Sequence, residues 1–240
     1  VSNAIAVQAD GKIIVVGNAG VDGFAVARYN YDGSPDNSFD GDGKLITDIG
    51  PSRDAAYTQA VQADGKILVA GVSFNETHYD FAMIRYNADG SLDNSFDADG
   101  KLTTNAGFSC DVHSIAIQAD GRIVLAGNSA DRKIQKSVLI RYNTDGSIDE
   151  TFGLDGKIVI SDFPVRPEYW NAMKIFGNRI YFAGYTITKT DKDFLLAAYL
   201  VQSTAQVSCP LDKTVQAEPS QCQAVVNAID PVITPAGNNV

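Results

Sequence analysis

One short motif recurs along this chain at a long and nearly constant interval, and this recurrence constrains the fold more than any other feature. The motif is Gln-Ala-Asp-Gly followed by lysine or arginine. Its clear copies begin at Gln8, Gln62 and Gln118. A second motif, Arg-Tyr-Asn, follows each copy. It begins at Arg28, Arg85 and Arg141. A long repeat of this kind is typical of architectures in which similar small units pack side by side.

A fourth and weaker copy follows the three clear ones. It keeps Tyr199 but has Ala198 where the other copies have arginine. One glycine recurs at an equivalent position in all the copies. These glycines are Gly17, Gly71, Gly127 and Gly184. We therefore predict repeats over residues 1–205 and a different segment after them. The predicted boundaries are about 1–52, 53–108, 109–166 and 167–205 for the repeats and 206–240 for the segment.

Each repeat predicts four short strands and no helix. In the first repeat, residues 4–8 are rich in apolar side chains, and Asp10-Gly11 predicts a type I′ hairpin turn. The β-branched run at residues 13–16 is typical of a strand that is covered on both faces. Residues 24–29 and 44–48 provide the third and fourth strands.

Four short antiparallel strands cannot bury both faces of their own sheet, so neighbouring repeats must cover them. The predicted fold is therefore an all-β propeller of four-stranded antiparallel blades. A β-solenoid fits less well because its coils are usually shorter. The fourth copy has only three clear strands and ends near Val201, while the chain opens on the first strand of a repeat. We expect an incomplete arc of a larger ring, with a closed four-bladed ring as the alternative.

At these motifs the sequence resembles the bacterial delta-sixty repeat family, a relative of the seven-bladed β-propeller-type repeats. The similar stretches are residues 6–17, 24–30 and 32–44 and their later copies. The resemblance covers roughly residues 1–200. It implies a repeat scaffold of the kind found in large exported or cell-surface proteins, often with adhesive roles. It brings no catalytic residues with it.

The C-terminal segment resembles the start of a hyalin repeat, an immunoglobulin-like module of extracellular adhesive proteins. The resemblance rests on residues 207–210 and 221–227, and it implies a truncated hyalin-like β segment at 206–240. A disulfide between Cys209 and Cys222 would stabilise this weakly cored stretch in an exported protein. A zinc site would need further ligands. We expect Cys110 to be a packed free thiol.

The charge balance narrows the possible partners. The chain has a formal net charge of −10 and a pI near 4.5. A nucleic-acid partner is not expected, because no basic surface is available to meet phosphates. No apolar run is long enough for a transmembrane helix, so we expect no membrane insertion. The acidity indicates either solubility or cation binding by the aspartate-rich loops.

Two of these loops are candidates for calcium. They place Asp40 and Asp42, and then Asp97 and Asp99, two residues apart before a glycine. The third repeat keeps only Asp155. Calcium prefers clustered oxygen ligands of this kind, but the same pattern also forms Asp-Gly turns with side-chain to backbone hydrogen bonds. We expect no required cofactor, with calcium as a possible ligand.

The repeated arginines allow two interpretations. Arg28, Arg85 and Arg141 could line a binding face, or each could pair with an acid such as Asp22 or Asp80. We favour the structural pair.

The sequence holds few groups suited to catalysis. The chain has two histidines, His78 and His113, and we interpret both as incidental. No nucleophile elbow, metalloprotease helix or phosphate-binding loop is present. Several aromatic residues could stack on sugar rings or pack in the core. They are Phe74, Tyr79, Tyr169 and Trp170.

The sequence therefore predicts a non-catalytic extracellular or cell-surface scaffold that presents propeller loops for adhesion, with a glycan or a surface protein as the partner. A polysaccharide lyase or hydrolase with its site in a central channel is the first alternative. A structural spacer without a ligand is the second. Fold alone does not decide between them.

Overall fold

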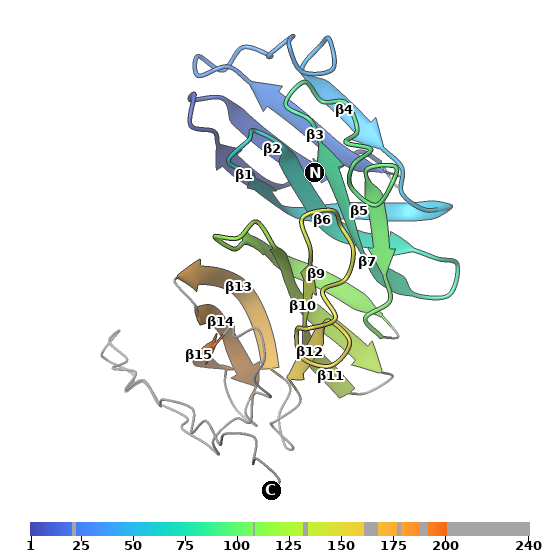
Figure 1. Ribbon diagram of the computed structural model, residues 1–240, viewed down its shortest axis with the longest axis vertical. Helices are drawn as coiled ribbons and strands as arrows, with labels where there is room; N and C mark the ends of the chain where they lie inside the picture. Colours follow the sequence, from blue (N-terminus) through green and yellow to red (C-terminus); the bar gives the residue numbers. More distant parts are fainter. Residues whose placement is uncertain are drawn as a thin grey trace, which may run out of the picture.

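The computed structural model describes residues 1–20, 23–107, 109–131, 134–160, 168–176, 179–187 and 192–200 (Figure 1). The predicted hyalin-like segment at 206–240 and the predicted Cys209–Cys222 disulfide lie outside these residues. The described part contains strands and turns but no helix, so it has none that could cross a membrane.

The strands form four separate antiparallel sheets, each with its strands in sequence order. The first sheet contains β1 (Ser2–Val7), β2 (Ile13–Asn18), β3 (Phe24–Tyr29) and β4 (Lys44–Thr47). The second contains β5 (Ser52–Val61), β6 (Ile67–Phe74), β7 (Tyr79–Tyr86) and β8 (Lys101–Thr104). The third contains β9 (Cys110–Ile117), β10 (Ile123–Asp131), β11 (Ile134–Tyr142) and β12 (Lys157–Ile160). The fourth contains β13 (Glu168–Phe176), β14 (Arg179–Ile187) and β15 (Lys192–Leu200). The predicted all-β fold of four-stranded antiparallel sheets is confirmed, and the fourth sheet has the three strands expected.

The sheets follow one another in a row, and each packs a face against the next (Figure 1). The first strands of neighbouring sheets are in contact, β1 with β5, β5 with β9 and β9 with β13. These strands therefore lie on a common inner side of the row. The first and fourth sheets lie at its two ends, so the described sheets form an open arc rather than a closed ring.

Apolar side chains fill each junction between sheets. On β6, Leu68 and Ala70 face the third sheet, whereas Ile67 and Val69 face the first. All these side chains are fully buried, so the prediction of a strand covered on both faces is confirmed for the second sheet. In the first sheet, only one face has a neighbour among the described sheets. Its β2 alternates between half-buried and buried residues for this reason.

The Asp10-Gly11 hairpin differs from the prediction. The backbone of Gln8 pairs with Lys12, so the loop has three residues rather than two. The Gly11 amide donates to the Gln8 carbonyl at 3.0 Å, and φ is positive at Gly11, 85°, but not at Asp10. This is a type I turn followed by a left-handed glycine, not a type I′ turn. The Lys12 amide donates to Asp10 Oδ1 at 3.1 Å and fixes the turn.

In the first three sheets, the recurring glycine of the second strand is required by a bulge in the first strand. In the second sheet the register shifts between Ala56 and Thr58, opposite Gly71. The bulge pushes the chain toward β6, and a Cβ atom at Gly71 would collide with the carbonyl oxygen of Ala55. The same collision would occur at Gly17 and Gly127.

The lone cysteine of the repeats is buried. Cys110 is a free thiol on β9, as predicted, and burial raises its pKa to about 11.

Replacing Gly71 with alanine tests the role of the bulge. The added methyl group must displace backbone rather than a flexible side chain, so we expect a loss of about 3 kcal/mol in the free energy of unfolding. Urea denaturation measures it. Thr103→Ala, at an exposed strand position, is the control and should change stability little. Equal stability of the two variants would show that the glycine is not needed for packing.

Candidate functional site

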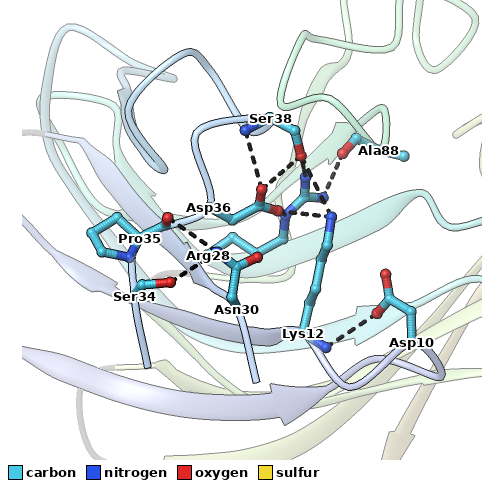
Figure 2. A network of polar contacts seen from close by, with 9 residues as sticks. All are labelled: Asp10, Lys12, Arg28, Asn30, Ser34, Pro35, Asp36, Ser38 and Ala88. Carbon is cyan, nitrogen blue, oxygen red and sulfur yellow. Dashed lines mark hydrogen bonds and ion pairs between the residues drawn. The ribbon is translucent and has the colours of Figure 1, made fainter. Parts of the chain in front are cut away.

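A network of charged and hydroxyl side chains lies where the third strand of the first sheet ends (Figure 2). In the first sheet, Arg28 Nε donates to Asp36 Oδ2 at 2.6 Å and its Nη2 donates to Ser38 Oγ at 3.1 Å. Lys12 Nζ lies 3.0 Å from the same Asp36 oxygen. The guanidinium stacks over the Phe39 ring, 4.6 Å from its centroid. Arg28 and Asp36 are both buried, so every charge is paired within the protein.

The same network recurs in the next two sheets. Its members are Arg85, Asp93, Ser95, Lys66 and Phe96 in the second sheet, and Arg141, Asp149, Thr151, Arg122 and Phe152 in the third. The distance from the arginine Nε to the aspartate Oδ2 is 2.6 Å in the second sheet and 2.7 Å in the third. The network is therefore a property of the repeat.

The arginine also joins consecutive sheets. Arg28 Nη1 donates to the carbonyl oxygen of Ala88 in the second sheet's loop, and Arg85 Nη1 donates to that of Thr144 in the third (Figure 2). Beside the first of these bonds, the Asp40 amide donates to the Asp89 carbonyl at 2.8 Å. One guanidinium thus fixes its own loop and the position of the next sheet.

The repeated arginines form structural ion pairs, as predicted, but Asp80 is not the partner of Arg85. Asp22 lies outside the described residues, and Asp80 accepts a hydrogen bond from Asn75 Nδ2 at 2.7 Å instead. The true partner follows each arginine by eight residues, because the chain folds back and the Asp36 amide donates to the Arg28 carbonyl at 3.0 Å. The constant spacing of an aspartate after each repeated arginine was the signal that could have identified it.

The aspartates of the network are held ionised. Burial by itself would raise the pKa of Asp36, but hydrogen bonds from Ser38, Lys12 and Arg28 outweigh it, and the pKa falls well below its usual range. Burial likewise opposes a lowered pKa at Asp93, where Ser95 and Lys66 are the main donors. A carboxylate in this state neither donates nor takes up a proton near neutral pH, so the network is suited to structure rather than to acid–base chemistry.

The calcium candidates lie in the same loops. Asp42 Oδ1 accepts the Lys44 amide at 2.9 Å and Asp99 Oδ1 accepts the Lys101 amide at 2.9 Å, so both aspartates form the side-chain to backbone turns that were the alternative. Three of the candidates have left-handed backbone conformations. They are Asp40, Asp97 and Asp155, with φ of 50°, 47° and 51°.

Neighbouring sheets bring further carboxylates to these loops. Burial, Asp99 and Asp145 together raise the pKa of Asp97. Within the described ranges, however, no group of three or more histidine, cysteine, aspartate or glutamate side chains is placed to hold a metal ion. Calcium binding stays a prediction.

A second polar cluster lies at the opposite edge of the second sheet. His78 Nε2 lies 3.0 Å from Asn75 Nδ2, 2.9 Å from Asn105 Nδ2 and 3.2 Å from Asp80 Oδ1. The cluster joins the loop between β6 and β7 to the crossing into the third sheet. Neither histidine recurs in another repeat, so this surface belongs to one sheet. Sequence reasoning missed it, because Asn105 lies far along the chain from His78.

Two of the predicted aromatic residues flank this cluster. The rings of Phe74 and Tyr79 lie 5.0 Å apart at an interplanar angle of 50°. The side chains of Tyr169 and Trp170 lie outside what the structure describes. His113, the other histidine, is half-buried, and its Nε2 lies 2.7 Å from Asn128 Nδ2. Burial lowers the pKa of His113.

Asp93→Asn tests whether the network stabilises the fold. The substitution leaves the buried Arg85 charge uncompensated, so we expect the free energy of unfolding to fall by about 3 kcal/mol at pH 7. The exposed Asp89→Asn is the control and should have a smaller effect.

The same variant has a pH signature. The folded-state pKa of Asp93 is depressed, so its contribution is complete above the unfolded pKa of about 4 and is lost as the pH falls below that value. The wild-type chain should therefore lose stability below about pH 4 more steeply than Asp93→Asn. Identical slopes in urea titrations across this range would contradict the assignment.

Three segments of the chain match one family model. Residues 8–39, 62–96 and 118–152 match the family described as a domain of unknown function (DUF5122) beta-propeller. Each segment runs from the first hairpin of a repeat to the aromatic residue of its network. No curated protein matches the sequence.

Several solved structures are similar to this chain. Drosophila semaphorin 1b, extracellular domains 1–2, is 14% identical with a TM-score of 0.45, over 83% of this chain and 40% of its own. An endo-1,4-beta-xylanase from Bacteroides thetaiotaomicron is 11% identical with a TM-score of 0.44, over 90% and 74%. An acylaminoacyl peptidase from Pyrococcus horikoshii is 11% identical with a TM-score of 0.41, over 82% and 32%.

This chain thus spans about two-fifths of the length of the semaphorin structure. The repeats that carry the arginine–aspartate network are β-propeller repeats that match the DUF5122 family model.

Proposed function

We propose that this chain is a non-catalytic scaffold of an exported or cell-surface protein, which holds one set of loops in position for binding a glycan or a protein. The observation that carries the proposal is that the repeated charged side chains form ion pairs and hydrogen bonds with groups of the protein itself. Arg28, Arg85 and Arg141 each bind an aspartate of their own loop. The most regular chemistry of the chain therefore serves its structure.

The loops at one edge of the row of sheets recur between repeats, whereas those at the other edge differ. Strand directions alternate within each sheet. The turns between first and second strands and the loops between third and fourth strands therefore share one edge, which carries the recurring networks. The loops between second and third strands and the crossings between sheets share the other edge. In the sequence these loops differ from repeat to repeat. Variable loops on a rigid framework are a common form of binding surface.

The variable edge of the second sheet has groups that suit a sugar. It combines the imidazole of His78 with the amides of Asn75 and Asn105, all at exposed or half-buried positions, and the aromatic pair of Phe74 and Tyr79 lies alongside. Amide and imidazole groups exchange hydrogen bonds with hydroxyls, and aromatic faces pack on the apolar faces of sugar rings. We infer a glycan as the first ligand class to test.

The extracellular location rests on sequence. It is supported by the resemblance to delta-sixty repeats and to the start of a hyalin repeat, and by the predicted disulfide between Cys209 and Cys222, which would need an oxidising compartment.

A glycan array followed by titration of any hit tests the proposal. We expect binding of the intact chain to be weakened roughly tenfold or more in the double variant His78→Ala, Asn105→Ala, since each lost hydrogen bond contributes about 1 kcal/mol. Glu150→Ala, at an exposed position on the constant edge, is the matched control and should bind as the wild type does.

Two results would contradict the proposal. Cleavage of a bound polysaccharide would favour the lyase or hydrolase alternative. Absence of binding on glycan and surface-protein arrays, with normal cooperative unfolding, would favour a structural spacer.

A further inference from the structure

The outer face of the first sheet is apolar and has no neighbour in the row. Cross-strand pairing places Ile5 beside Val15 and Val7 beside Ile13 on this face. Ile5 is 69% exposed and Val7 is 68% exposed. In the second and third sheets, the residues in the register of Val15 are Val69 and Leu125, and both are fully buried against the preceding sheet. The outer face of the first sheet therefore has apolar residues at positions that the second and third sheets bury against a neighbouring sheet.

The outer face of the fourth sheet has apolar residues at positions that the second sheet buries against the sheet that follows it. Phe194 and Leu196 on β15 occupy the register of Phe81 and Met83 on β7. Phe81 and Met83 are fully buried against the following sheet, whereas Phe194 is 61% exposed and Leu196 is 42% exposed. The two ends of the row thus carry apolar residues in the registers that meet at the internal junctions, although the described fourth sheet has no fourth strand.

Two positions hold residues of different size at the open ends and at the internal junctions. Internally, an arginine of one sheet reaches the backbone of a small residue in the next, as Arg28 does at Ala88. At the open ends the arginine position holds Ala198, and the small-residue position holds Tyr31, which is 84% exposed. The large and small residues are therefore exchanged at the open ends relative to the internal junctions.

We infer that two copies of this chain pair head to tail, with the outer face of the first sheet of one copy packed on the outer face of the fourth sheet of the other. The contact continues the packing of the internal junctions and covers the exposed Ile5, Val7 and Phe194. Such a contact is heterologous, since it joins two different surfaces, and two copies that use both of their ends would form a ring of eight sheets.

Two single substitutions separate the faces. Ile5→Glu blocks the first face and Phe194→Glu blocks the second, and both positions are exposed, so the fold should persist, as circular dichroism would check. Light scattering after size exclusion should find the wild-type chain as a dimer at micromolar concentrations and each variant as a monomer. Leu154→Glu, at a position that is 79% exposed and lies outside both faces, is the matched control and should stay dimeric.

Mixing the two variants provides the decisive measurement. Each retains one intact face, and these faces are complementary, so an equimolar mixture should form a one-to-one dimer. A monomeric wild-type chain would overturn the inference. So would a variant that still dimerises alone, because that would indicate pairing of like faces, and so would a mixture that stays monomeric.

Discussion

Burial of each sheet's apolar faces by its neighbours is the constraint on which the rest of this structure depends. A four-stranded sheet of this size has too little interior of its own, and side chains from both faces must leave water for it to be stable. The second sheet meets this requirement fully, since Ile67 and Leu68 point to opposite faces and both are inaccessible to solvent. The first and fourth sheets meet it on one face only. The stability of the second sheet therefore depends on both of its neighbours.

The arginine–aspartate networks complete the junctions that apolar packing begins. Packing of flat apolar faces is not directional, and sheets could slide along one another without additional contacts. A guanidinium that binds Asp36 in its own loop and the Ala88 carbonyl in the next sheet fixes both register and spacing. Tyr86 adds a second bond, because its hydroxyl donates to Thr47 Oγ1 in the preceding sheet at 2.8 Å. These groups are therefore committed to the framework.

The sequence was sufficient to predict the strands, the sheets and the open arc, because these follow from local patterns and from the repeat. The third strand, Phe24–Tyr29, lies where the sequence placed it. The partner of Arg28 was not predicted, because it depends on how a loop folds back and not on apolar periodicity. The His78–Asn105 contact was missed for a related reason, since it depends on the path of the chain from one sheet to the next. Local rules therefore predicted the framework and failed where distant loops meet.

The central claim is that no sheet of this row is stable without a neighbour. Its most direct test is circular dichroism and urea denaturation of a fragment that spans residues 52–104, the whole second sheet, kept dilute so that it stays monomeric. The account predicts no strand signal and no cooperative transition, because the faces that carry Ile67 and Leu68 would both be exposed to water. A fragment that unfolds cooperatively, with the strand content of the intact chain, would contradict it.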